Sequence, residues 1–223
     1  MLETDYVSHY KIHSNPVAEN LYASNEVFDL DDIEPLQKLD FGNGKVSIDN
    51  TEYEEVEILS YENFVKKCVK PSSFLQGRKR CDYILLHPST NGYALLIELT
   101  SSKESIANLR KPIEKNGKIQ FIGGKFEKCE TQLFQSLKDL LEVSSINSAF
   151  SKQSKRMCLM AYKIEKTNVD NVETNIIKRP FQRYLSVESN ITKENGAIIP
   201  CESIESLGFE YRRINHDFTF KLK

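Results

Sequence analysis

The sequence predicts an α/β fold, of the α+β kind, in which one mixed central β-sheet is flanked by helices. Three apolar runs at residues 84–86, 94–97 and 157–162 lack polar alternation, which is typical of strands covered on both faces. Between the second and third runs, residues 125–143 carry apolar side chains at three- and four-residue steps, which predicts a long amphipathic helix. Strands and helices that follow one another in this way favour layered packing around a single sheet.

Composition limits the classes of protein that the chain fits. Its 223 residues, 39% of them hydrophobic, suit one domain with elaborations. No apolar run approaches the roughly 20 residues that span a bilayer, and the N-terminus lacks the order of a signal peptide. Five scattered Cys without a CxxC pair disfavour zinc and a disulfide framework. We therefore expect no membrane contact and a reducing, cytoplasmic location.

Charge divides the chain into three parts: an acidic N-terminal arm (1–42), a core (43–165), and a C-terminal extension packed on the core (166–223). Residues 1–62 carry 15 acids and 3 bases, whereas residues 64–80 carry 6 bases and no acid. Residues 101–128 add 7 bases and 3 acids. Such runs are commonly solvated faces, but basic segments on both sides of a site also suit a phosphate-bearing substrate.

The elements before the central strands follow from period and turn chemistry. The N-terminal arm shows no clean period. Residues 45–48 and 53–59 alternate on either side of Asp49-Asn50, which predicts a hairpin. Ser60 is a suitable cap for a helix over 61–69, and the apolar residues of that helix fall on one face.

The remaining elements centre on two neighbouring strands, 82–86 and 93–100. A Pro-Ser-Thr-Asn-Gly turn joins them and favours antiparallel pairing. The other segments are a basic loop at 71–80, a short helix at 104–110, a strand at 119–122, the long helix, the strand at 157–162, and one or two final strands within 209–222.

Each of the two central strands carries one carboxylate where an apolar residue is expected. Asp82 opens the first strand, and Glu98 lies near the end of the second. Buried acids are costly unless they are paired, and a divalent cation is a common partner. Mg²⁺ or Mn²⁺ takes oxygen ligands and keeps several waters, and the backbone carbonyl of Leu99 is a third candidate ligand. Such an ion activates water and stabilises charge on a phosphodiester.

These residues resemble the PD-(D/E)xK nuclease superfamily over about residues 60–165. The motif Arg80-Cys81-Asp82-Tyr83, then Ile97-Glu98-Leu99, then Gln132-Leu133 on a helix is similar to that of small bacterial members. The resemblance implies a restriction-endonuclease-like sheet with core order α-β-β-β-α-β. It also implies that Asp82 and Glu98 bind metal, that Glu62 adds a further acid, and that Gln132 lies near the site.

One position departs from the family pattern. The family places Lys two residues after the Glu, and this chain has Thr100 there. Some members carry the Lys on the next helix, which makes Lys125 the first substitute, Lys128 the second, and Lys103 a loop alternative. A site that none of them reaches is expected to be inactive.

The sequence therefore predicts a Mg²⁺-dependent endodeoxyribonuclease that acts on DNA, with RNA as the other possible substrate. It is expected to work with a protein partner in a larger complex, by family analogy in bacterial defence or DNA processing, and a homo-oligomer is left open. Its expected contacts with nucleic acid are basic residues in the two flanking segments: Lys66, Lys67, Lys70, Arg78, Lys79, Arg80, Lys103, Arg110 and Lys111.

Two alternatives remain at this stage. The first is a catalytically inactive nuclease-fold subunit that binds nucleic acid or a partner, and Thr100 favours it. The second is an antitoxin-like regulator whose acidic residues 1–62 mimic nucleic acid. His87, before Pro88, is interpreted as structural. The trio Gly123-Gly124-Lys125 lacks the rest of a phosphate-binding loop.

Overall fold

The computed structural model describes residues 2–11, 20–32, 37–40, 42–53, 55–67, 79–102, 111–115, 118–122, 125–164 and 195–222. Its helices are α1 (Leu2–Tyr10), α2 (Tyr61–Lys67), α3 (Lys125–Leu141), α4 (Ser144–Ser151) and α6 (Glu202–Glu205). Its strands are β1 (Asn20–Ala23), β2 (Val27–Leu30), β3 (Val46–Asp49), β4 (Val56–Ser60), β5 (Tyr83–Leu86), β6 (Tyr93–Ser102), β7 (Lys111–Lys115), β8 (Lys118–Ile122), β9 (Lys155–Ile164), β10 (Ala197–Ile198), β11 (Glu210–Asn215) and β12 (Thr219–Lys221).

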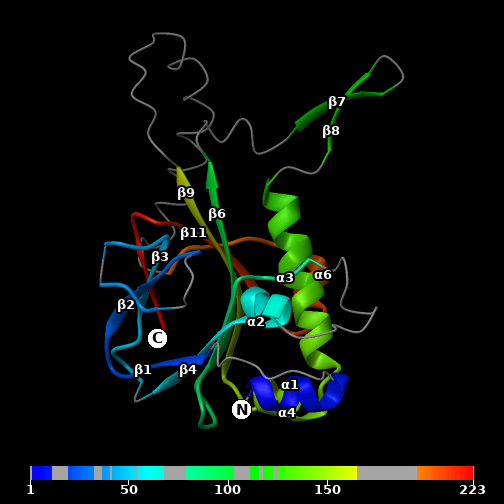
Figure 1. The fold of residues 1–223 in the computed structure, drawn as a ribbon. Helices are drawn as coiled ribbons and strands as arrows, with labels where there is room; N and C mark the ends of the chain where they lie inside the picture. The colour runs from blue at the N-terminus through cyan, green and yellow to red at the C-terminus, as the bar shows by residue number, and fades with distance from the viewer. Residues whose placement is uncertain are drawn as a thin grey trace.

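A mixed sheet of seven strands forms the centre of the molecule (Figure 1), in the order β1-β4-β5-β6-β9-β11-β10. β5 pairs antiparallel with both β4 and β6, whereas β6, β9 and β11 run parallel. The crossover from β6 to the parallel strand β9 contains α3, as parallel pairing requires. The predicted mixed sheet flanked by helices is confirmed, as are the central positions of β5, which Asp82 directly precedes, and of β6, which carries Glu98.

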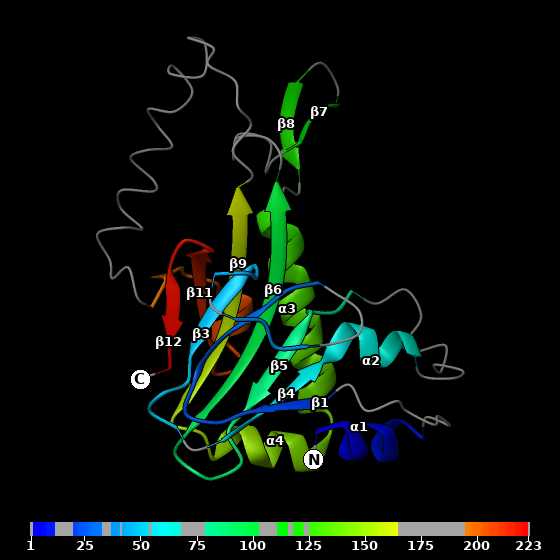
Figure 2. The same ribbon diagram turned by 60° about the vertical axis from the view of Figure 1, so that its left-hand side comes forward.

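The two faces of the central sheet bury two separate apolar clusters. Helices α1, α2, α3, α4 and α6 cover one face, where residues such as Phe64, Leu133 and Phe150 pack on alternate sheet residues. A three-stranded sheet, in the order β12-β3-β2, covers the opposite face with residues such as Ile48 and Phe220. Figure 2 shows this small sheet in front of the central strands, with α3 behind them. Both faces of β5 and β6 are therefore dry, which explains their unbroken apolar runs.

The predicted hairpin of residues 45–48 with 53–59 is wrong. The turn itself exists, since the Thr51 N–H donates to Asp49 Oδ1 at 3.0 Å. After this turn the chain passes from the three-stranded sheet to the central sheet. β3 therefore pairs with β2 and β12, whereas β4 pairs with β1 and β5. Both strands bury apolar side chains in the same cluster from opposite sheets. An alternating apolar pattern predicts which side chains of a strand are buried, but it does not predict which strand is the hydrogen-bonded neighbour.

The predicted core strand at 119–122 also pairs differently. It is β8, whose partner is β7 in a separate two-stranded sheet. The third strand beside β5 and β6 is instead β4, which precedes α2. The arm supplies β1 to the central sheet and β2 to the small sheet, and the C-terminal extension supplies β10, β11 and β12. All three predicted segments therefore share the same two sheets.

The helices α1 and α4, which the sequence pattern did not predict, pack beneath α3 (Figure 1). The short helix predicted at 104–110 lies outside the described residues. Within the described part of the chain, no helix is long and apolar enough to cross a bilayer.

Candidate functional site

The backbone of β6 fixes the position of Asp82. The Asp82 N–H donates to the Ile97 carbonyl at 3.0 Å, which adds one bond to the ladder between β5 and β6. Two residues further along β6, the Leu99 N–H donates to Asp82 Oδ2 at 2.6 Å. The N–H and C=O of one strand residue face the same edge, so the Leu99 carbonyl also faces Asp82. The Asp82 carboxylate therefore lies beside β6, just before the first residue of β5.

Glu98 points from β6 toward the helices. Strand alternation places it on the same face as Leu96, and α3 covers that face. Gln132 Nε2 donates to Glu98 Oε1 at 2.7 Å and to the Arg80 carbonyl at 2.9 Å. Glu98 is only 4% exposed. Its other oxygen, Oε2, is buried and has no hydrogen-bond partner among the residues that the structure describes.

Burial raises the pKa of both carboxyl groups. The pKa of Glu98 is raised to about 9, first by burial and next by the negative charge of Asp82, while Lys128 opposes the rise. Burial also raises the pKa of Asp82 to about 7, where the Leu99 N–H opposes the rise and Asp32 adds to it. A cation bound between two such carboxyls would favour their ionised forms and so oppose the rise in their pKa values.

A cavity of about 410 Å³ opens beside Asp82. Its walls come from β4, α2, β5 and the end of β2, and it is lined by Asp32, Ser60, Glu62, Asn63, Lys66, Asp82 and Tyr83. Glu62 and Asp32 both raise the pKa values of Asp82 and Glu98. Lys66 pairs with Glu62 at 3.0 Å. The cavity is therefore predominantly acidic where it meets Asp82.

The donor set fits a hydrated divalent cation. Asp82 and Glu98 supply hard carboxylate oxygens, the buried Oε2 of Glu98 lacks a partner, and the Leu99 carbonyl faces Asp82. Mg²⁺ is commonly held by one or two carboxylates together with several waters. In the described part of the chain, no group of three or more His, Cys, Asp or Glu side chains forms a metal cluster. The arrangement thus offers two side-chain ligands rather than a closed protein cage.

The two candidate lysines at the start of α3 have different surroundings. Lys125 is half-buried, and its ammonium donates to the backbone carbonyl of Ser101 at the end of β6. Lys128 is exposed, makes no hydrogen bond to a described residue, and lowers the pKa of Glu98 through its charge. Thr100 lies near Cys129 and lowers the pKa of its thiol, against the rise caused by burial. Of the two lysines, Lys128 is therefore the one whose charge acts on Glu98.

The residues predicted to contact nucleic acid differ in their surroundings. Lys66, Lys67 and Lys79 are exposed around α2 and the start of the strand that follows it. Arg80 is buried and hydrogen-bonds Tyr6 inside the helical layer, so its guanidinium is not on the surface that a phosphate would reach. The side chains of Lys70, Arg78, Lys103, Arg110 and Lys111 lie outside the described residues.

Sequence reasoning missed the contribution of the acidic arm to the site. Asp32 follows β2 and lines the cavity beside Asp82. Lys45, just before β3, forms ion pairs with Asp32 at 2.6 Å and Asp31 at 3.1 Å and lowers the pKa of Asp82. The acidic cluster around residue 30 was visible in the sequence. Its approach to Asp82 depends on the small sheet, which no local pattern indicated.

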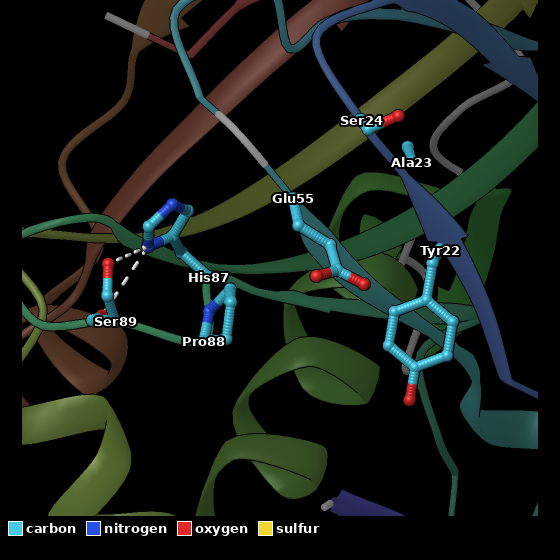
Figure 3. Close-up of a pocket in the computed structure, with 7 residues that line it drawn as sticks. All are labelled: Tyr22, Ala23, Ser24, Glu55, His87, Pro88 and Ser89. Carbon is cyan, nitrogen blue, oxygen red and sulfur yellow. Dashed lines mark hydrogen bonds between the residues drawn. The ribbon is translucent and has the colours of Figure 1, made fainter.

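A further cavity, of about 300 Å³, lies near the turn after β5 (Figure 3). Ser89 Oγ lies 3.0 Å from His87 Nδ1, and the His87 ring packs against Tyr53 and Tyr93. Figure 3 shows the Glu55 carboxylate between this turn and Tyr22. These contacts hold the imidazole within the turn, in keeping with a structural role for His87.

Comparison with protein-family models, with curated proteins and with solved structures finds no match for this chain.

Proposed function

We propose that this chain is a divalent-metal-dependent nuclease of the PD-(D/E)xK type that hydrolyses phosphodiester bonds in DNA. The observation that carries the proposal is the buried pair of Asp82 and Glu98. One oxygen of Glu98 lacks a partner among the described residues, and the pKa values of both groups are raised. Without a further partner, Glu98 Oε2 stays unpaired, and ionising either acid in the apolar interior is costly. A bound Mg²⁺ would offset that cost.

The order of elements around the pair supports a restriction-endonuclease-like fold. The resemblance implies a helix, three strands, a helix and a further strand. In this chain α2 precedes β5 and β6, and α3 and the parallel strand β9 follow them. The third antiparallel neighbour, β4, comes before α2 rather than after β6, which departs from the implied order. The two acids keep to neighbouring strands as in the motif, since Asp82 directly precedes β5 and Glu98 lies within β6.

Each residue of the proposed site has a definite task. The Leu99 N–H orients Asp82, and the Gln132 amide orients Glu98. Lys128 favours the ionised form of Glu98, which is the form that binds a cation. Bound Mg²⁺ would supply charge stabilisation and an activated water at the phosphodiester. Glu62, beside the same cavity, is placed to accept hydrogen bonds from ordered water.

Contacts with the DNA backbone are assigned to the exposed lysines near α2. Lys66, Lys67 and Lys79 carry positive charge beside an acidic cavity, which offsets the repulsion between the carboxylates and phosphate. Phosphate contacts position a duplex without reading its bases. We therefore propose cleavage with weak sequence preference.

A second candidate is an inactive nuclease-fold subunit that binds nucleic acid. Two observations favour it. Thr100 takes the family position of the catalytic lysine, and the ammonium of Lys125 is engaged by the Ser101 carbonyl. This candidate keeps binding to DNA but has no chemistry.

Cleavage assays separate the two candidates. The wild type is incubated with plasmid, linear duplex, single-stranded DNA and RNA, with Mg²⁺, with Mn²⁺ and with chelator. We expect metal-dependent cleavage of DNA that Asp82→Asn and Glu98→Gln each lower by about 100-fold or more. The matched control is Glu202→Gln, which changes an exposed acid on α6 and should cleave like the wild type.

The outcomes are distinct. DNA binding without cleavage in any metal identifies the inactive subunit. Cleavage that survives Glu98→Gln at the wild-type rate contradicts the site assignment even if the chain is a nuclease. Loss of cleavage in Glu202→Gln as well would indicate a general effect of the changes on folding, which thermal melting of each variant detects.

A further inference from the structure

The edge of the central sheet at β1 is open among the residues that the structure describes. β1 is the first strand in the sheet order, and no described strand pairs with its other side. The opposite edge strand, β10, has only two residues, and so short an edge limits unwanted pairing. β1 has four residues and contains neither Lys nor Pro, which commonly block an edge. A further strand can therefore pair with β1.

Strand register shows which backbone groups of β1 face this open edge. The Tyr61 N–H donates to the Asp82 carbonyl at 2.8 Å, in the register of β4 with β5. Because the direction of these groups alternates along a strand, the N–H and C=O of Glu57 also face β5. Glu57 is opposite Tyr22 of β1, so the N–H and C=O of Tyr22 point away from β4. No described residue outside β1 and β4 forms a backbone hydrogen bond with them.

The Tyr22 side chain lies at the same edge. It is 53% exposed, the largest exposed fraction among the large apolar side chains in the described ranges. Burial of the remainder raises the pKa of its hydroxyl, and three nearby carboxylates raise that pKa further: those of Glu57, Glu55 and Glu3. An aromatic ring attracts a cation through its face, and the neighbouring carboxylates add to that attraction.

The cavity of about 300 Å³ near the turn after β5 adjoins this edge (Figure 3). Residues 22–24 line it together with the turn at 87–89, and Figure 3 shows the Glu55 carboxylate between them. Glu55 is exposed and forms no hydrogen bond or ion pair with a described residue. No Lys or Arg from the described part of the chain lines the cavity. A cationic side chain is therefore the group that suits this cavity best.

We infer that the open edge of β1 and the cavity beside it bind an extended segment of a partner protein that carries Lys or Arg. The segment adds to β1 as a strand and places a cationic side chain beside the Tyr22 ring and the Glu55 carboxylate. The inference does not depend on the proposed nuclease function, since it requires neither a metal ion nor the pair of Asp82 and Glu98.

Charge and distance favour this occupant over the others. An added strand lies two strand spacings from β4, or about 10 Å, and a long cationic side chain together with the Glu55 carboxylate spans that distance. A second copy of this chain, paired through β1, would bring the same carboxylates of both copies to one edge, and like charges oppose such pairing. The same carboxylates repel the backbone of a nucleic acid.

Fluorescence anisotropy with labelled synthetic peptides tests this inference. The probe is a short peptide in which valine alternates with lysine. We expect saturable binding with a Kd below about 1 mM that weakens at high salt. One comparison peptide carries glutamate in place of lysine, and another is N-methylated at alternate residues. Each should bind about tenfold more weakly or less, because the first lacks the positive charge and the second lacks N–H groups that pair with a strand edge.

Variants of the protein locate the binding site. Glu55→Gln removes the charge and Tyr22→Ala removes the ring, and each should weaken binding of the lysine peptide about two- to fivefold. Tyr22→Pro also removes the outward N–H, which an edge strand tolerates, and should weaken binding more than Tyr22→Ala. Glu202→Gln, which changes an exposed acid on α6, should bind as the wild type does. Glu98→Gln should also leave peptide binding unchanged, which separates this inference from the nuclease proposal.

Several outcomes would overturn the inference. They are absence of saturable binding of the lysine peptide, equal binding of either comparison peptide, and wild-type affinity in Glu55→Gln and both Tyr22 variants. Sedimentation that shows a dimer in the wild type and a monomer in Tyr22→Pro would make a second copy the occupant instead. Thermal melting shows whether each variant is folded, and the N-methylated peptide tests strand pairing with the wild type if Tyr22→Pro is not.

Discussion

Gln132 Nε2 donates to Glu98 Oε1 at 2.7 Å, and the same nitrogen donates to the Arg80 carbonyl at 2.9 Å. The amide thus links α3 to the start of β5 and to the centre of β6. It directs one oxygen of Glu98 to the helix and leaves Oε2 for another partner. Groups that orient a metal ligand in this way commonly change metal affinity by 10–100-fold when they are removed.

The first prediction concerns Gln132 itself. Gln132→Leu removes the hydrogen bond to Glu98 and puts an apolar side chain of similar size in its place. The pKa of Glu98 should therefore rise, and Mn²⁺ affinity should fall about 10–100-fold. Titration of Mn²⁺ by calorimetry at pH 8 measures the change. Gln135→Leu, one turn along the same helix, removes a hydrogen bond to Asp139 instead. If Gln135→Leu lowers affinity as much, the effect does not come from Glu98.

The pH dependence of stability without metal is the second prediction. Burial raises the pKa of Glu98 to about 9 and of Asp82 to about 7, whereas both groups titrate near pH 4 in an unfolded chain. Between these values the folded state holds more protons, so the free energy of unfolding should fall as the pH rises from about 4 to 9. The two groups make their full contribution to the free energy of unfolding only below about pH 4.

Denaturant titration in chelator at pH 5 and pH 9 measures this loss. Glu98→Gln cannot ionise at that position, so it should lose less stability and exceed the wild type at pH 9 by about 1–3 kcal/mol. Glu202→Gln should follow the wild type at both values. Added Mg²⁺ should stabilise the wild type more at pH 8 than at pH 6, because a cation competes with protons for the carboxylates. A wild type that gains stability between pH 5 and pH 9 would falsify the buried-acid account.

Lys128 provides the third prediction. Its positive charge lowers the pKa of Glu98, so Lys128→Gln should raise that pKa further. Cleavage, or Mn²⁺ binding where cleavage is too slow, should then require a higher pH than in the wild type. Lys138→Gln is the control, since Lys138 is exposed on the same helix and lies near Phe134 rather than Glu98. An unchanged pH profile in Lys128→Gln would exclude an electrostatic role for this residue.

Much of the central fold could be predicted because it follows from strong local patterns. The runs at 84–86, 94–97 and 157–162 are apolar throughout, and they became strands covered on both faces. The helix from residue 125 has its apolar side chains on one face. α1 lacked such a signal, because its buried residues are Leu2, Glu3 and Tyr6, a set in which a polar side chain interrupts the apolar face.

The parts that could not be predicted depend on contacts between distant segments. β3 alternates like a hairpin strand, but its partners are β2 and β12, one of which lies at the far end of the chain. Asp32 and Lys45 act on Asp82 only because that small sheet covers the central strands. The sequence indicated which acids are unusual, whereas the tertiary fold determines which charges surround them.

The ion pair between Arg213 and Glu130 carries the fourth prediction. Arg213 Nη2 lies 2.6 Å from Glu130 Oε1, Nε donates to the Tyr211 hydroxyl at 3.1 Å, and Cζ lies 4.2 Å from the Phe126 ring centroid. These contacts fasten the first turns of α3 to β11. Arg213→Ala should lower the free energy of unfolding by about 2–4 kcal/mol. Glu130→Gln should cost less, because the carboxylate is partly exposed.

Thermal and denaturant unfolding measure the loss, and cleavage gives a second readout. Since α3 carries Lys128 and Gln132, loosening its start should also lower activity at temperatures where Arg213→Ala remains folded. Arg212→Ala, on the opposite face of β11, is the matched control and should leave α3 in place. Equal effects of the two changes on cleavage would show that the link runs through β11 as a whole.

The fifth prediction concerns the turn that sets the register of β5 and β6. Asn91 has a φ of +66°, and a Cβ on Gly92 would lie 2.5 Å from the His87 ring. Gly92→Ala must therefore displace His87, which packs against Tyr93. We expect a loss of about 2 kcal/mol or more, compared with about 1 kcal/mol for Asn91→Ala, where only the left-handed backbone is strained. Asn91→Gly accepts that backbone and should cost least.

Because register places Asp82 opposite the middle of β6, the same series tests how the turn supports the site. Two hydrogen bonds depend on this register of β5 and β6. The Asp82 N–H donates to the Ile97 carbonyl, and the Leu99 N–H donates to the Asp82 carboxylate. Gly92→Ala should weaken Mn²⁺ binding along with stability, whereas Asn91→Gly should preserve both. Metal affinity that stays at the wild-type value in a destabilised Gly92→Ala protein would show that the ladder, rather than the turn, sets the position of Asp82.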